Sequence, residues 1–183
     1  MLFLIVFLCA VIVAAGLGLL SGLSDLHGMI IPNIYPLGII VAFVFAYVAC
    51  AASGNSGPFQ TLSSHLWAGG VAFVVTFAMT MAKVMGGGDS KLITAYALWM
   101  GVLNIAWFLF TMALVGAVLA VAAVLIRRHK PFKVVKAGTW VARLQSGEAV
   151  VPYGIPIAAS ALYMFVVNHY LTIGVLKAFL MPT

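Results

Sequence analysis

The chain has three acidic residues, Asp25, Asp89 and Glu148. The first two stand at the ends of long apolar runs, where a carboxylate is costly unless the site needs it, so both are candidate functional residues. Two carboxyl groups brought together cannot both ionise cheaply, so they share one proton. The ionised group can activate a water molecule, while the protonated group polarises a scissile carbonyl and later protonates the leaving amine. This is the chemistry of an aspartic peptidase, in which Asp25 and Asp89 would be the catalytic pair.

Three glycines, Gly86, Gly87 and Gly88, directly precede Asp89. Without side chains they would let the backbone turn freely and let a substrate peptide lie close against it, so we expect them to contact substrate. A triple glycine is also entropically costly to order, so we expect this turn to be poorly fixed without substrate. The two aspartates could then stand too far apart to share a proton until a peptide binds.

Other residues near the two acids have supporting roles in this prediction. Pro32 favours a break after the first apolar run, and Asn33 follows it at the start of the next. Lys91 lies two residues after Asp89, so on a helix the two side chains do not face each other. Lys91 is therefore expected to bind lipid headgroups rather than to tune Asp89. The alternative for both acids is that they merely cap helices or pair with Lys91 or Lys83.

Neither a metal nor another cofactor is expected. His65, His129 and His169 are scattered, and His27 is expected to be an interfacial residue. The two cysteines, Cys9 and Cys50, lie singly inside apolar runs, a pattern typical of small buried side chains. Glu148 is expected to pair with a nearby Arg or Lys.

Composition indicates an all-α integral membrane protein with one domain. Hydrophobic residues make up 65% of the chain and charged residues 7%, with a mean hydropathy of +1.22. The apolar runs are continuous rather than alternating, which favours helices over a barrel. The net charge of +6 does not indicate nucleic-acid binding, because there is no soluble basic region that could hold a duplex.

Six transmembrane helices are predicted, at about residues 2–23, 34–52, 66–84, 91–101, 104–126 and 152–171. Residues 92–126 contain no charged side chain. As one helix they would be about 52 Å long, whereas the hydrocarbon layer is only about 30 Å thick. We therefore expect a hairpin with its turn near residues 101–104.

Charge distribution predicts the orientation. If the Asp89 loop is cytoplasmic, eight of the nine basic residues fall on that side and only Lys177 falls outside. Span counting then places Asp25 on the cytoplasmic side and both termini on the outer side. Residues 127–150 form a cytoplasmic segment that mixes basic and apolar residues and is expected to lie along the membrane surface.

Three motifs resemble those of the type IV prepilin peptidases. Gly86-Gly87-Gly88-Asp89 fits the GxGD signature of membrane aspartyl proteases, Asp25 is followed by Ile31-Pro32-Asn33, and Val151-Pro152-Tyr153-Gly154-Ile155-Pro156 resembles the opening of that family's last helix. Order and spacing match across nearly the whole chain. Its length is similar to that of the short members associated with tight-adherence (Flp) pili.

The resemblance implies a specific activity. The substrate would be a prepilin or pseudopilin in the bacterial inner membrane, and its short basic leader would be removed after a glycine at the cytoplasmic face. Longer members carry an additional region with paired cysteines that accompanies N-methylation, so methyltransferase activity is not expected here. Family members commonly have basic residues between the first aspartate and Ile-Pro-Asn. Here residues 26–30 read Leu-His-Gly-Met-Ile, which would alter contacts to lipid headgroups or to the leader, or lower activity.

A second class of function stays open. In a non-enzymatic membrane carrier or a pilus-assembly scaffold, Asp25 and Asp89 would handle protons or ions. A carrier would place its acids near the bilayer midplane and often shows an inverted repeat, whereas both acids here stand at the ends of apolar runs. Membrane lipids are expected partners in either case, and the oligomeric state is left open.

Overall fold

The computed structural model describes residues 1–54, 59–132, 135, 138–148, 150–168 and 170–171. Its regular structure is entirely helical over these residues, which confirms the all-α membrane class. The elements are α1 (Leu2–Gly28), α2 (Ile34–Ala52), α3 (Leu62–Met81), α4 (Gly87–His129), α5 (Trp140–Gln145) and α6 (Gly154–Val167). Among them, α1 to α4 are long and apolar enough to cross a membrane, and α6 is a shorter apolar helix.

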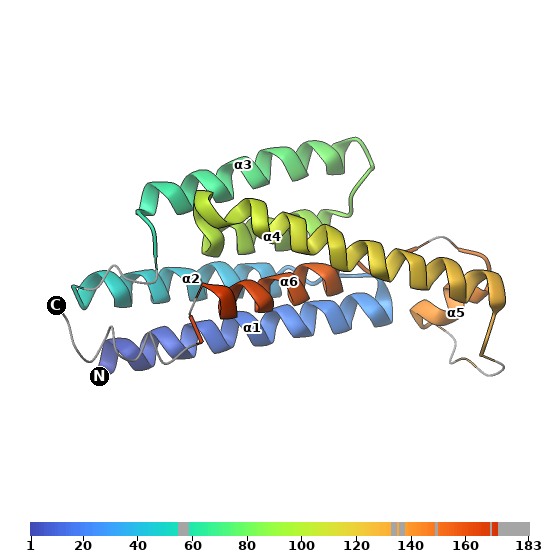
Figure 1. Ribbon diagram of the computed structural model, residues 1–183, viewed down its shortest axis with the longest axis horizontal. Coiled ribbons are helices and arrows are strands. Elements are labelled where there is room, and N and C mark those ends of the chain that lie inside the picture. The colour runs from blue at the N-terminus through green and yellow to red at the C-terminus, as the bar shows by residue number, and fades with distance from the viewer. Residues whose placement is uncertain (55–58, 133–134, 136–137, 149, 169, 172–183) are drawn as a thin grey trace.

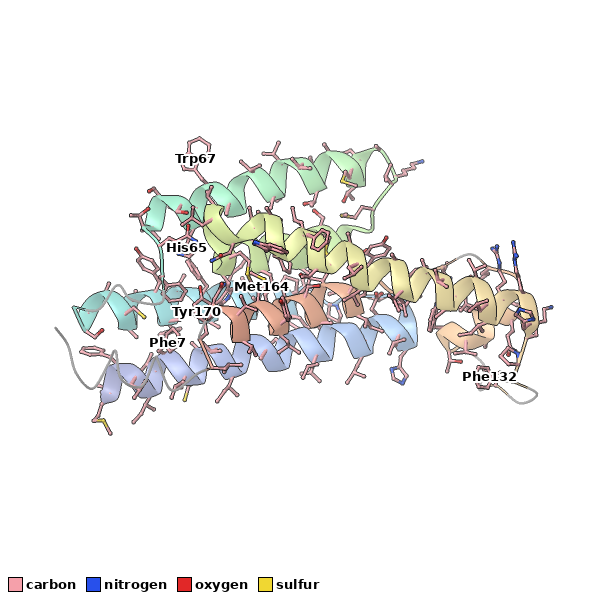
Figure 2. All side chains as sticks on the ribbon, in the orientation of Figure 1. Phe7, His65, Trp67, Phe132, Met164 and Tyr170 are labelled. Carbon is pink, nitrogen blue, oxygen red and sulfur yellow. The ribbon has the colours of Figure 1, made fainter. Side chains whose placement is uncertain are left out.

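The helices form a bundle in which α1 and α2 run side by side and α6 lies against α1 and α4 (Figure 1). Helix α3 stands at the edge and packs against α4 (Figure 1). Since the outer surfaces of a membrane bundle face lipid, large apolar side chains such as Trp67 and Phe110 remain exposed there. Figure 2 shows Trp67 pointing away from the bundle.

Helix α4 is two helical segments joined at Gly101. This residue has φ 65° and ψ 174°, a conformation essentially restricted to glycine. The chain reverses there, as Figure 1 shows, and the Tyr96 and Phe108 rings on the two segments lie 6.3 Å apart. The reversal lies at residue 101, where a turn was predicted because residues 92–126 are too long for a single span. After the reversal, the chain returns to the end of the bundle at which α4 begins.

Side chains at the start of α3 satisfy the backbone groups that this turn leaves free. Such groups must find partners because lipid offers none. The hydrogen bonds are His65 Nδ1 with Leu98 O (2.6 Å), Gln60 Nε2 with Met100 O (3.0 Å), Val102 N with Ser64 Oγ (3.0 Å) and Leu103 N with Gln60 Oε1 (3.3 Å). The backbone N–H of Gln60 donates to Nε2 of His65, so the imidazole is neutral and carries its proton on Nδ1.

An aromatic core holds the bundle together near this turn. Trp99 is fully buried, and its ring meets Phe43, Phe165 and Tyr170. The polar atoms of these rings are paired with backbone carbonyls, as burial requires: Trp99 Nε1 donates to Ile39 O at 3.1 Å, and the Tyr170 hydroxyl donates to Trp99 O at 3.0 Å. Trp99 therefore fixes the end of the first segment of α4 against α2 and α6.

A smaller cluster lies at the opposite end of the molecule. The last turns of α4 extend beyond α1 and pack against α5 through Ala123, Trp140 and Leu144 (Figure 1). Leu26 and Met29, at the end of α1, pack against the same cluster. The ends of α1 and α4 therefore share one apolar cluster with α5, close to Asp25.

Several helix ends differ from the expected spans. Helix α1 continues past residue 23 to Gly28, so Asp25 lies within its last turn rather than after it. Helix α4 begins at Gly87 rather than at residue 91, so Gly87 and Gly88 are helical and not part of a loop. Helix α3 covers 62–81 instead of 66–84, and α6 covers 154–167 instead of 152–171. Within the expected segment 127–150, α5 is helical, and Lys133 and Lys136 lie outside the described residues, as do His169 and Lys177.

Candidate active site

A pocket of about 330 Å³ lies where the end of α1, the α1–α2 connection and the start of α4 meet. Its lining residues are Asp25, Met29, Ile30, Ile31, Asn33, Gly86, Gly87, Gly88, Asp89 and Lys91. Seven of the eight residues singled out from the sequence therefore come together here, and Pro32 stands in the same connection without lining the pocket. Two carboxyl groups and a lysine give this pocket a polar wall at the edge of an apolar bundle.

Asp25 is held by two backbone contacts at the end of α1. Its side chain is buried, with 6% exposure, and its Oδ2 accepts a hydrogen bond of 2.8 Å from the backbone N–H of Gly154. Its carbonyl accepts the N–H of Met29 at 2.9 Å, where Met29 closes the helix in a left-handed conformation with φ 55°. A non-glycine residue there is mildly strained, and such strain clusters at functional sites.

Asp89 is the third residue of α4 after the N-cap Gly86. Its carboxyl group accepts a hydrogen bond from the backbone of Gly86, which is the geometry of a capping box. The helix dipole also favours an acid at this position. A Cβ atom on Gly86 would lie 2.9 Å from Asp89 Oδ2. Glycine at position 86 therefore leaves room for the Asp89 carboxyl group to bond to the start of its own helix. Helix capping, the alternative role considered for the two acids, thus describes this one contact of Asp89.

The two carboxyl groups interact electrostatically with each other and with no described cation. Lys91 donates instead to Asn33 Oδ1 at 2.8 Å. The ion pair found in the described part of the chain joins Arg143 and Glu148 at 2.8 Å on the exposed surface near α5, as expected for Glu148. The dyad thus faces the pocket without a neutralising salt bridge among the described residues.

The glycines next to Asp89 contact the protein's own chain, and Gly87 and Gly88 belong to α4 rather than to a turn. That these glycines contact substrate stays a prediction. None of the three has a positive φ. A Cβ atom on Gly88 would lie 2.9 Å from the Cβ of Ile31, a buried residue of the α1–α2 connection. Together with the bond between Lys91 and Asn33, this contact holds residues 31–33 against the start of α4 and closes one wall of the pocket.

Three further residues support the site and were not singled out from the sequence. Ser90, next to Asp89, is buried and shares a hydrogen bond of 2.8 Å with the hydroxyl of Thr76 on α3. Thr76 also donates to the carbonyl of Ala72, so Ser90 is the donor in the shared bond. Gly154 lies in a motif that the sequence does show, but its bond to Asp25 joins positions 129 residues apart. No local pattern marks Thr76 or Ser90, since hydroxyls commonly occur in membrane helices.

This arrangement is suited to general acid–base catalysis on a polypeptide. Two carboxyl groups on different helices approach one pocket, and each is oriented by a backbone N–H. One ionised and one protonated carboxyl group in one pocket can transfer protons to and from a water molecule and an amide. Over the described residues, no three His, Cys, Asp or Glu side chains gather as metal ligands.

Comparison with known proteins gives one match. A sequence model of the type IV leader peptidase family matches residues 11–121. The matched range includes both aspartates, the three glycines and Lys91, and it ends before α6. No curated protein and no solved structure gives a significant match.

Proposed function

Because this chain belongs to the type IV leader peptidase family, we propose that it is a membrane aspartyl endopeptidase. In this proposal it removes the short basic leader of a prepilin or pseudopilin after a glycine, at the cytoplasmic face of the bacterial inner membrane. Its motifs and length favour a substrate of the tight-adherence (Flp) pilus class. The observation that carries the proposal is that Asp25 and Asp89 line one pocket, although they belong to helices that are far apart in the sequence.

In the proposed reaction, a water molecule lies between the two carboxyl groups. The ionised carboxylate takes a proton from the water as its oxygen bonds to the scissile carbonyl carbon, and the protonated partner donates its proton to the carbonyl oxygen. When the tetrahedral intermediate collapses, the carbon–nitrogen bond breaks. As the carbonyl re-forms, a hydroxyl group of the intermediate returns its proton to the second carboxylate. The amine receives the proton held by the first carboxyl group, and both steps together restore the starting state. No bond between enzyme and substrate forms at any step.

The distribution of basic residues supports a cytoplasmic active site. Six basic residues of the described chain belong to the segments that meet at the dyad end of the bundle: Lys83, Lys91, Arg127, Arg128, Lys130 and Arg143. Cytoplasmic segments of membrane proteins carry such an excess of Lys and Arg. The same residues can bind anionic lipid headgroups, which fits the proposal of lipid partners.

Cleavage of a prepilin in cells tests the proposal. The protein is co-expressed with a Flp-type prepilin, and processing is followed as a leader-sized shift in electrophoretic mobility. Wild-type protein should cleave, whereas Asp25→Asn and Asp89→Asn should each lower processing on the order of 10³-fold or more while the protein still inserts. Because the two carboxyl groups act as a unit, the double variant should be little worse than either single one.

Glu148→Gln is the matched control, since it also neutralises an acid but on the exposed surface beside Arg143. It should process like wild type. Substantial cleavage by either single dyad variant would remove aspartyl catalysis from consideration. Normal cleavage combined with lost pilus assembly would instead support the scaffold or carrier alternative.

A further inference from the structure

We infer that Gly154 is a positioning residue, whose backbone N–H orients the Asp25 carboxyl group for the reaction. The inference rests on the proposed function and extends it to α6, which lies beyond the matched part of the chain. It concerns the first residue of that helix, and the contact carrying it is the 2.8 Å bond from Gly154 N to Asp25 Oδ2.

The backbone N–H of Gly154 makes no hydrogen bond within α6. The first N–H groups of a helix have no partner within it and point outward along the helix axis. In α6 the N–H of Gly154 is directed at Asp25, and Pro156, two residues later, has no N–H. The positive end of the helix dipole therefore adds to the attraction for the carboxylate.

The approach of the two groups requires glycine at this position. A Cβ atom on residue 154 would lie 3.0 Å from Asp25 Cβ, 3.2 Å from Asp25 Oδ2 and 3.3 Å from Gly22 Cα. Backbone and Cβ atoms cannot swing aside as the tip of a long side chain can. A methyl group here would therefore displace α6 from α1 or turn the carboxyl group away from its donor.

The other side of α6 is supported by α4. A Cβ atom on Gly116 would lie 3.6 Å from the Tyr153 ring and 3.8 Å from Pro156 Cγ, so the first turn of α6 is packed closely on the second segment of α4. Helix α6 is thus held between α4 and α1, with its first N–H group at the Asp25 carboxyl group. Only one of the two oxygens, Oδ2, takes part in this contact.

The bond from Gly154 to Asp25 restricts rotation of the carboxyl group, and the proposed reaction depends on the orientation of that group. A carboxyl group with no partner turns about its Cβ–Cγ bond, and its two oxygens exchange places. With Oδ2 held by Gly154, Oδ1 is the oxygen left for water in the pocket that Asp25 lines. Misplacement of a catalytic group by about 1 Å can lower the rate on the order of 10²-fold, so the loss of this constraint should reduce kcat.

Two alanine variants separate positioning from packing. Gly154→Ala places a methyl group against Asp25, whereas Gly22→Ala places one in the same contact between α1 and α6, at 3.4 Å from Gly154 O and away from the carboxyl group. Both purified proteins are assayed in detergent with a peptide that spans the leader junction, and thermal unfolding is recorded for each. We expect Gly154→Ala to lower kcat at least tenfold with KM within twofold of wild type, and Gly22→Ala to change neither by more than twofold.

A spectroscopic test covers the case in which Gly154→Ala does not fold. In protein labelled with ¹⁵N-glycine, the amide proton of Gly154 should resonate downfield because it is bonded to a carboxylate. We expect it to move upfield in Asp25→Ala and to stay in place in Glu148→Gln. An unchanged Gly154 resonance in Asp25→Ala would overturn the inference, because the bond would then be absent.

Failure of the inference differs from failure of the proposed function. If wild-type protein cleaves the peptide but Gly154→Ala and Gly22→Ala have the same kcat, Gly154 serves packing alone and the proposed function stands. If wild-type protein cleaves no prepilin peptide, the proposed function fails, and a role for Gly154 in that reaction fails with it.

Discussion

Substitution of Gly88 by valine should impair cleavage because of a steric conflict with Ile31. A Cβ atom at position 88 would lie 2.9 Å from Ile31 Cβ and 3.5 Å from its Cγ1. The first distance is about 0.6 Å shorter than the 3.5 Å at which carbon atoms attract each other. Ile31 is buried and its Cβ is tied to the backbone, so the α1–α2 connection itself must move. Valine adds two more methyl groups to the conflict.

This displacement acts directly on the pocket, because Ile31 and Gly88 are both lining residues. Overpacking of this kind destabilises a protein by about 1–3 kcal/mol. A shift approaching 1 Å beside the proposed catalytic pair lowers rates by up to about 10²-fold. We therefore expect kcat of Gly88→Val to fall between about tenfold and hundredfold, while thermal unfolding in detergent shows that the protein remains folded.

Gly87→Val is the matched control. It changes the neighbouring residue of the same helix start, but its Cβ atom would meet only Thr80 Cγ2, at an ordinary 3.8 Å. Cleavage of a prepilin peptide is measured for both variants at saturating substrate. Wild-type turnover in Gly88→Val would refute the steric argument. An equal loss in Gly87→Val would show that the Ile31 contact does not by itself control the rate, because Gly87 also lines the pocket.

The remaining predictions concern the turn of α4 and the orientation of the chain. Gly101→Ala should destabilise the protein by about 1–3 kcal/mol from backbone strain alone, since φ is 65° and a Cβ atom would lie 2.8 Å from the Gln60 carboxamide; an unchanged thermal midpoint in detergent would contradict this. Cysteines at Ser63 and Ser146, both exposed, should react with an impermeant thiol reagent from opposite sides of the membrane when the native cysteines are removed. Labelling of both from one side would show that the proposed topology is wrong.

Local features of the sequence were sufficient for the membrane class and for the choice of candidate residues. Continuous apolar runs identify the segments that lie in lipid, and those segments are helical because backbone groups in lipid must bond within a helix. Acidic residues are so few here that Asp25 and Asp89 stand out without any knowledge of their surroundings. The length of residues 92–126 required a reversal because it exceeds the bilayer, and the backbone reverses at Gly101.

The reasons for glycine at positions 86 and 88 came only from the tertiary structure. On its sequence alone, Gly86-Gly87-Gly88 suggested a flexible turn that a substrate could approach. In the folded chain, Gly86 makes room for the Asp89 carboxyl group and Gly88 for Ile31, while Gly87 and Gly88 open a regular helix. A glycine pattern shows that side chains are absent, but it cannot show which neighbour occupies the space.

The orientation of the Asp25 carboxyl group was likewise decided by packing. Hydropathy is a property of short segments, and it is enough to count the spans. The number of spans between Asp25 and Asp89 then predicts that both lie at the same end of the bundle. The bond between Gly154 and Asp25 joins positions 129 residues apart. It exists because α6 is packed between α1 and α4, and such a contact depends on the shapes of three helices rather than on the composition of any one of them.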